Sequence, residues 1–164
     1  MRAPILQLVV VLAAVLVTQT SSILKASAES IPLKNLPKGA LQAAKKLFPG
    51  AEIVGATKED GGKEISYDIE LKTKKQTVYV TVNDKGEVGL ITKEIPVKAL
   101  PPAVAKAVSL MYPKARLTDA EEIWDVDGGK QKLDYYNVVI ETADKKTVEV
   151  EVTPQGKIQD SSAK

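Results

Sequence analysis

The chain has 164 residues, a formal net charge of +2, and neither cysteine nor histidine. It therefore lacks disulfides, thiolate nucleophiles, and the commonest general base and metal ligand, which argues against the usual nucleophilic and metal-dependent enzymes. The small net charge also argues against nucleic-acid binding, which needs a basic field to displace counterions from phosphate.

Residues 1–28 have the layout of an export signal. A basic start at Arg2 is followed by an apolar run over Ile5–Val17, and Ala26-Ser27-Ala28 supplies small residues for cleavage. The apolar run is shorter than the roughly 20 residues that a membrane-spanning helix needs. We expect cleavage after Ala28, a periplasmic or secreted product, and no stable membrane insertion after signal removal. The alternative is an uncleaved N-terminal anchor.

Removal of residues 1–28 would leave a chain of almost no net charge. Arg2 and Lys25 are the basic residues of that segment and it has no acidic residue, so 23 basic residues become 21 against 21 acidic ones. We expect no nucleic-acid partner for such a chain.

Residues 31–94 recur in altered form at residues 95–164. The segment IPLKNLP, which begins at Ile31, corresponds to IPVKALP, which begins at Ile95. Likewise FPGA, from Phe48, corresponds to YPKA, from Tyr112. This internal similarity predicts two tandem repeats, with domains at residues 29–94 and 95–164 after the signal at 1–28.

Each repeat opens with a predicted helix bracketed by prolines. Proline suits the first helical turn and cannot continue a helix, so the segments run over Pro37–Phe48 and Pro101–Tyr112. Apolar residues recur at spacings of three and four in both segments, which predicts amphipathic helices that pack on a sheet.

After each helix the hydrophobic period changes to two, which is typical of strands. Short turns connect the segments, so we expect antiparallel meanders. The predicted fold class is α+β, with two tandem repeats, each one helix packed on a four-stranded antiparallel β-meander. The expected strands are 52–58, 63–71, 76–82 and 88–94 in the first repeat, and 116–126, 131–141, 146–152 and 157–159 in the second.

Aromatic residues that face outward would form a protein-binding surface. If Tyr136 and its alternate neighbours face the core, Tyr135 and Val139 must face outward. Trp124, the only tryptophan, precedes them in the chain, and Tyr79 is an aromatic residue of the first repeat. Because aromatic rings dominate interface energies, we hypothesise protein binding through Trp124, Tyr135, Val139 and Tyr79. The alternative is that Trp124 packs in the core or at a seam between the repeats.

The segment from Asp125 to Gly129 begins like a calcium-binding loop. However, Lys130 stands at the position that requires glycine and Tyr136 at the position that requires glutamate. We therefore expect no metal site. The sequence also predicts no catalytic residue and no cofactor.

Both repeats resemble the PepSY-like domains of exported bacterial proteins. The shared pattern is Leu-Pro, an alanine-rich helix, an aromatic-Pro-x-Ala stop, a Tyr-x-Ile/Val strand and a Val-x-Val-x-Val strand with a glycine turn. It occurs from Leu36 to Val88 and from Leu100 to Ile158. The resemblance implies a module without enzymatic activity, similar in plan to the secreted β-lactamase inhibitor protein. This chain lacks the disulfides of that inhibitor, so inhibition of a β-lactamase is not carried over.

Taken together, these features predict an exported, non-catalytic binding module. Its expected partner is another exported protein or a peptide, which it would bind, inhibit or regulate. The alternative is a module that senses a small ligand in a cleft between the two repeats.

Overall fold

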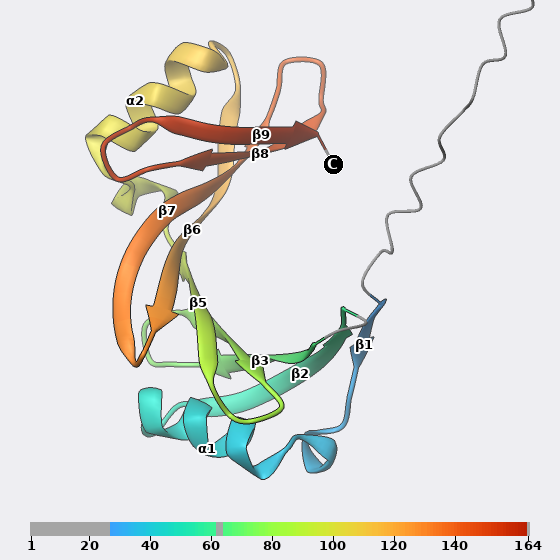
Figure 1. The fold of residues 1–164 in the computed structure, drawn as a ribbon. Coiled ribbons are helices and arrows are strands. Elements are labelled where there is room, and N and C mark those ends of the chain that lie inside the picture. The colour runs from blue at the N-terminus through green and yellow to red at the C-terminus, as the bar shows by residue number, and fades with distance from the viewer. Residues whose placement is uncertain (1–26, 62–63, 164) are drawn as a thin grey trace, which may run out of the picture.

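The computed structural model describes residues 27–61 and 64–163, which form one strongly curved sheet and two helices (Figure 1). The elements follow in the order β1 (Ser27–Ser30), η1 (Leu33–Asn35), α1 (Lys38–Leu47), β2 (Glu52–Asp60), β3 (Ile65–Lys72), β4 (Thr77–Asn83), β5 (Val88–Ile95), η2 (Val97–Ala99), α2 (Pro102–Met111), β6 (Arg116–Asp127), β7 (Lys130–Glu141), β8 (Thr147–Val152) and β9 (Ile158–Ala163). The signal predicted for residues 1–28 lies almost entirely outside the described residues, and the predicted cleavage after Ala28 would fall within β1.

The described strands form a single nine-stranded antiparallel sheet in which the strand order is the chain order, β1 to β9. The predicted fold class, two tandem repeats each with one helix on its own four-stranded meander, is therefore wrong. Strands β5 and β6 pair from Leu90 with Asp125 to Ile95 with Ala120, so the two expected meanders are one sheet. Strand β1 extends this sheet at the β2 edge. The assigned domain limits, 29–94 and 95–164, stay predictions.

Both helices lie on the outer side of the curved sheet (Figure 1). Each follows a proline at its N-cap, Pro37 for α1 and Pro101 for α2, as the sequence predicts. Helix α1 buries Ala40 and Ala44 completely, and these small side chains let the helix approach the strands closely. Helix α2 buries the larger Val104 and Val108. The last turn of α2 differs from the predicted apolar stripe, because Met111 is 48% exposed.

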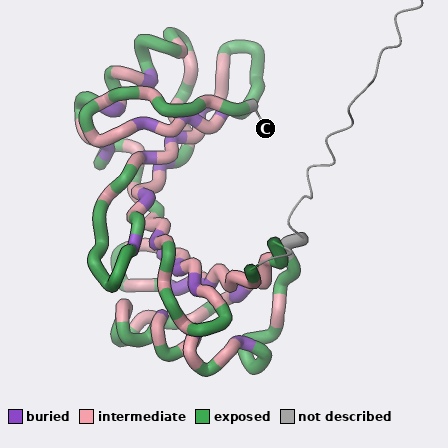
Figure 2. Tube along the Cα trace, viewed as in Figure 1, coloured by how far each residue is buried: buried purple, intermediate pink, exposed green. Residues whose placement is uncertain are grey.

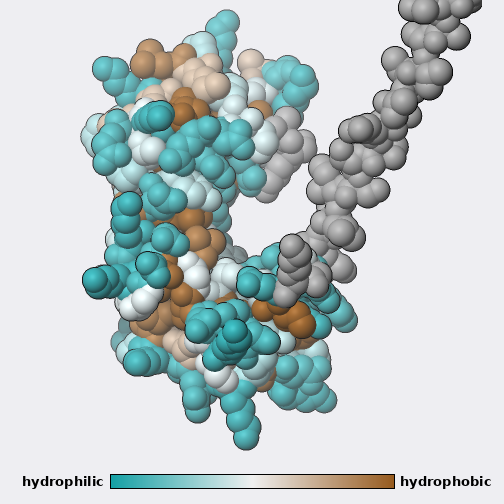
Figure 3. All heavy atoms as spheres, in the orientation of Figure 1, coloured by the Kyte–Doolittle hydropathy of each residue, from teal (hydrophilic) through white to brown (hydrophobic). Residues whose placement is uncertain are grey.

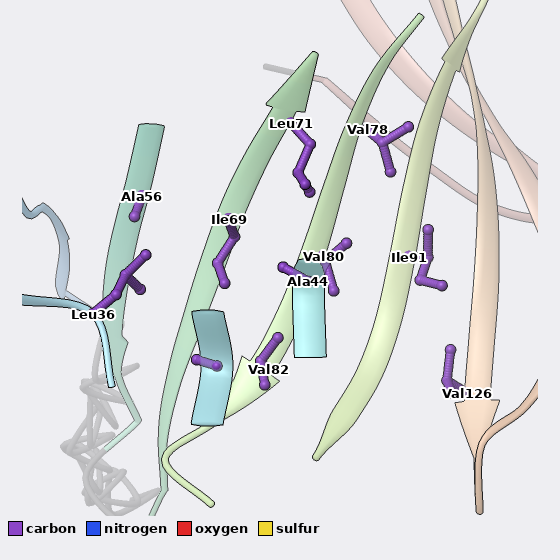
Figure 4. Packing of buried hydrophobic residues seen from close by; sticks show 11 residues of the cluster. Leu36, Ala44, Ala56, Ile69, Leu71, Val78, Val80, Val82, Ile91 and Val126 are labelled. Carbon is purple, nitrogen blue, oxygen red and sulfur yellow. The ribbon is translucent and has the colours of Figure 1, made fainter. Parts of the chain in front are cut away.

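The hydrophobic core has two parts, one beneath each helix. Beneath α1, alternate residues of neighbouring strands point toward the helix (Figure 4). They include Ile69, Val80 and Ile91, which are fully buried. Beneath α2, Val138 and Val150 have no exposed surface. Buried positions follow the strands in both halves of the molecule (Figure 2), which confirms the predicted alternation on these strands.

Each helix also touches the turn that follows a strand beneath it. Gly156 has a φ of +83°, a conformation that L-residues rarely adopt, and a Cβ atom there would lie 2.7 Å from the backbone oxygen of Ala103 in α2. In the first half, a Cβ atom at Gly86 would lie 3.0 Å from the carbonyl carbon of Gly39 in α1. Glycine is therefore required at both turns for the helices to pack where they do.

Candidate protein-binding face

The sheet face opposite the helices, called the open face below, lines the inside of the curve (Figure 1). A row of paired residues crosses four of its strands. Tyr79 in β4 pairs with Thr92 in β5, Thr92 pairs with Ile123 in β6, and Ile123 pairs with Tyr135 in β7. Directly paired residues of neighbouring strands point to the same side, so these side chains form one continuous stripe.

Ile123 is the apolar centre of this stripe. It is only 5% exposed, although it belongs to neither of the two clusters beneath the helices. Tyr79, Thr92 and Tyr135 are themselves half-buried. Neighbouring side chains of the open face therefore shield this isoleucine from water without a covering helix. In the space-filling view, hydrophobic residues appear along the spine of the molecule, and further hydrophobic residues are visible toward both ends (Figure 3).

Carboxylates surround the two tyrosines. Glu70 in β3 pairs with Tyr79, and the Tyr79 hydroxyl donates a hydrogen bond to Glu94 Oε1 at 3.2 Å. Glu121 in β6 pairs with Glu94, and its Oε2 accepts a hydrogen bond from Asn137 Nδ2 at 3.1 Å. Three strands thus bring three carboxylates close to Tyr79.

This arrangement raises the pKa of both phenols. Burial raises the pKa of Tyr79 to about 12, together with the negative charges of Glu94, Glu70 and Glu121 and the hydrogen bond to Glu94. Burial also raises the pKa of Tyr135, with contributions from Glu151, Asp134 and Glu121. A phenol of ordinary pKa is already neutral at physiological pH, and these upward shifts keep both tyrosines protonated to a still higher pH.

Of the four residues hypothesised for protein binding, the structure places three on the open face. Tyr79 and Tyr135 belong to the stripe described above. Val139 also faces this side, because it pairs with Asp119 in β6 and Glu149 in β8. Val139 lines a hollow of about 700 Å³ whose wall also includes Glu94, Asp119 and Glu121.

Trp124 lies on the other face and is not brought together with these residues. It pairs with Ile91 and packs against the core beneath α1. Its Nε1 donates a hydrogen bond to Glu122 Oε2 at 3.0 Å, and Lys93 Nζ lies 4.0 Å from the ring centre. The alternation along β6 places Ile123, not Trp124, on the open face.

A β-bulge between β6 and β7 lets Tyr135 lie on the open face while Leu133 pairs with Trp124 on the helix-covered face. The register of β6 and β7 shifts between Ile123, which pairs with Tyr135, and Trp124, which pairs with Leu133. Asp134 is the extra residue of β7. Leu133, before it, therefore lies on the same face as its partner Trp124, and Tyr135, after it, lies on the same face as its partner Ile123. Strand alternation within β7 alone would have placed Leu133 on the same face as Tyr135.

The sequence alone did not identify Thr92, Ile123 or the carboxylates around Tyr79 as parts of this face. Thr92 and the carboxylates stand at alternate polar positions of β3, β5 and β6, whereas Ile123 is an apolar residue among the polar positions of β6. Alternation shows which residues of one strand share a face, but only the register shows which strands lie side by side. The pairing of β5 with β6 supplies that information here.

A second hollow, of about 880 Å³, lies at the end of the sheet near the β4–β5 turn. Its wall includes Ala43 and Leu47 of α1, Asn83 and Glu87. Among residues 27–61 and 64–163, no group of three carboxylates is placed to hold a metal ion. The segment that begins like a calcium loop forms the end of β6 and a tight turn with positive φ at Gly128 and Gly129.

No protein-family model matches the sequence, and no curated protein matches it. The fold is similar to that of several proteins of known structure. A DUF2874 family protein from Bacteroides uniformis is 16% identical, with a TM-score of 0.64 over 78% of this chain and 89% of the other. A BLIP-like protein from Bacteroides fragilis is 19% identical, with a TM-score of 0.58 over 76% and 84%. A protein from Bacteroides eggerthii, described provisionally as periplasmic, is 13% identical, with a TM-score of 0.63 over 77% and 88%.

These likenesses show a shared fold. The BLIP-like neighbour supports the predicted relationship in plan to the secreted β-lactamase inhibitor. PepSY-like domains are not shown by any of the three, so that resemblance stays a prediction. In the part of the chain that the structure describes, neither helix has the length and hydrophobicity needed to cross a membrane.

Proposed function

We propose that this protein is an exported, non-catalytic module that binds another exported protein or peptide through its open face. The observation that carries this proposal is the stripe of Tyr79, Thr92, Ile123 and Tyr135, an aromatic and apolar band that no helix covers. Tyrosine is enriched where one protein binds another, because its ring gives contact area and its hydroxyl gives a directional hydrogen bond.

The shape of the sheet supports the same function. The open face lines the inside of a curve, so it can surround a protruding part of a partner (Figure 1). The BLIP-like neighbour has this fold, and its name links the fold to inhibitor-like proteins. The predicted export signal and the provisionally periplasmic neighbour support a place outside the cytoplasm. Inhibition or regulation of the partner is part of the proposal.

Affinity capture tests the proposal. The full chain would be expressed with its own N-terminal segment, immobilised, and incubated with the exported proteins of the source cells. We expect a retained protein that is lost from the Tyr79→Ala/Tyr135→Ala variant, because truncation removes most of the contact area of the stripe. The matched control is Leu110→Ser/Met111→Ser, which removes two exposed apolar side chains of α2 on the other side of the sheet.

A retained protein that binds the tyrosine variant as well as the wild type would contradict binding through the open face. The alternative of a small ligand is tested separately by thermal shift with metabolites. A metabolite that raises the melting temperature by several degrees, without any retained protein, would favour the sensing module. The hollow lined by Val139 and Glu94 favours this alternative, because it brings together residues from both halves of the chain.

A further inference from the structure

The charges of this nearly neutral protein are separated between the two sides of the sheet. Neither helix contains an acidic residue, whereas α1 contains Lys38, Lys45 and Lys46, and α2 contains Lys106. The open face has the opposite character. The strand register places many carboxylates on it, among them Asp68, Glu70, Glu94, Asp119, Glu121, Asp125, Glu149 and Glu151.

Few positive charges share that face. Lys72 lies at the end of β3, Arg116 at the start of β6, and Lys130 and Lys132 at the start of β7, so all four stand at its margins. Within residues 27–61 and 64–163, no lysine or arginine nitrogen lies within 4.0 Å of a carboxylate oxygen of Glu70, Glu94 or Glu121. The centre of the open face therefore combines uncompensated negative charge with the apolar and aromatic stripe.

We infer that the open face binds a segment rich in lysine or arginine on the partner protein. This inference rests on the proposed function and adds the chemistry of the partner. Carboxylates form charge-assisted hydrogen bonds with guanidinium and ammonium groups. The ring faces of Tyr79 and Tyr135, which lie among those carboxylates, attract the same cations. Aliphatic stems of lysine and arginine side chains would pack against Ile123 and the tyrosine rings.

A second copy of this chain also offers a basic surface, the helix layer. That surface is convex and lies on the outside of the curve (Figure 1). Its lysines stand on helices that are packed on the sheet, whereas a concave acidic face fits a projecting segment. We therefore assign the face to a basic segment of another protein, and self-association is an outcome of the test.

The test uses a defined probe, a fluorescent peptide of about twelve residues that alternates lysine and alanine. A matching peptide of glutamate and alanine is the negative probe. Binding to the full chain is measured at low and at physiological salt. We expect the lysine peptide to bind, the glutamate peptide not to bind, and the affinity to fall as salt screens the charges. Glu70→Gln/Glu94→Gln/Glu121→Gln should weaken lysine-peptide binding by about tenfold, because three exposed charge pairs are lost.

The control variant removes three exposed charges elsewhere. Glu29 lies in β1, and Asp84 and Glu87 lie in the β4–β5 turn, all outside the stripe. Glu29→Gln/Asp84→Asn/Glu87→Gln changes the net charge equally and should bind the lysine peptide almost as well as the wild type. Equal weakening by both triple variants, or no binding of the lysine peptide by the wild type, would overturn the inference. A wild-type dimer in sedimentation that the Glu70→Gln/Glu94→Gln/Glu121→Gln variant dissociates would also overturn it, in favour of a second copy.

Failure of the inference is distinguishable from failure of the proposed function. A captured protein that is lost with Tyr79→Ala/Tyr135→Ala but retained with the three glutamate substitutions would leave protein binding by the open face in place and remove the basic partner. A captured protein that binds the tyrosine variant and the triple glutamate variant as well as the wild type would contradict both the proposed function and the basic partner.

Discussion

On the helix-covered face, Ile69 and Val80 have no exposed surface because a helix completes the layer above them. On the open face, Ile123 reaches almost the same burial with only the side chains of its own sheet around it. The first arrangement stabilises the fold, since it removes apolar area from water on all sides. The second leaves tyrosine rings and carboxylates accessible above an apolar base. One sheet thus separates stability from recognition by assigning them to its two faces.

The largest expected effect comes from the same substitution made on both faces. Ile69→Ala should lower the free energy of unfolding by about 2–5 kcal/mol, because it leaves a cavity beneath α1. Ile123→Ala should cost only about 1–2 kcal/mol, because water and neighbouring side chains can fill the space. Chemical denaturation of both variants measures the difference. Equal losses would show that the open face is as much a part of the core as the covered face.

The contact between each helix and the turn beneath it comes next. Gly156→Ala should cost about 2–3 kcal/mol, because the new methyl group meets the Ala103 oxygen and the backbone keeps a positive φ. Gly128→Ala is the matched control. Gly128 has a φ of +55° with no atom within 4 Å of a Cβ atom, so only the backbone cost of about 1 kcal/mol applies. If both variants melt at the same temperature, the packing of α2 on this turn does not contribute to stability.

Trp124 offers a further comparison of the two faces, because it lies on the helix-covered face while its neighbour Ile123 lies on the open face. Trp124→Phe keeps most of the ring but removes the hydrogen bond to Glu122 and weakens the contact with Lys93. We expect a loss of about 1 kcal/mol in the free energy of unfolding and no change in partner capture. A loss of capture with unchanged stability would instead place Trp124 in the binding surface, as the sequence hypothesis had it.

The smallest effect is a pH dependence from Tyr79. Its pKa is raised from 10.0 to about 12 in the folded protein, so above pH 10 the unfolded chain loses this proton while the folded chain still holds it. The contribution of Tyr79 to stability is complete below pH 10 and is lost as the pH rises to about 12. The free energy of unfolding should therefore fall more steeply in that interval for the wild type than for Tyr79→Phe.

Spectroscopic titration provides the matching readout. Tyr79→Phe should remove a phenolate component that titrates near pH 12. Glu94→Gln should lower the pKa of Tyr79, since it removes the charge of the hydrogen-bonded neighbour. An unchanged titration in the Glu94→Gln variant would show that the two side chains do not interact in solution.

The sequence predicted the local structure well because its signals are local. Pro37 and Pro101 mark the helix starts, and the alternation around Val80 and Val138 assigns those residues to the core. The pairing of β5 with β6 could not be predicted from these signals, because a helix and a 3-10 turn separate the two strands in the chain. Alternation alone gives the faces of Tyr79 and Tyr135, but which residues lie beside them depends on that pairing and on the bulge at Asp134, and β6 presents Ile123 rather than Trp124 to this face.

Chemical modification of tyrosines, with and without the captured partner, tests most directly whether the open face is the binding surface. Tyr79 and Tyr135 lie on that face, while Tyr67 and Tyr112 pack against the cores beneath the helices. The structure predicts that the partner protects Tyr79 and Tyr135 and leaves the modification of Tyr67 and Tyr112 unchanged. Unchanged modification of Tyr79 and Tyr135 in the complex, or protection confined to Tyr67 and Tyr112, would contradict recognition by this face.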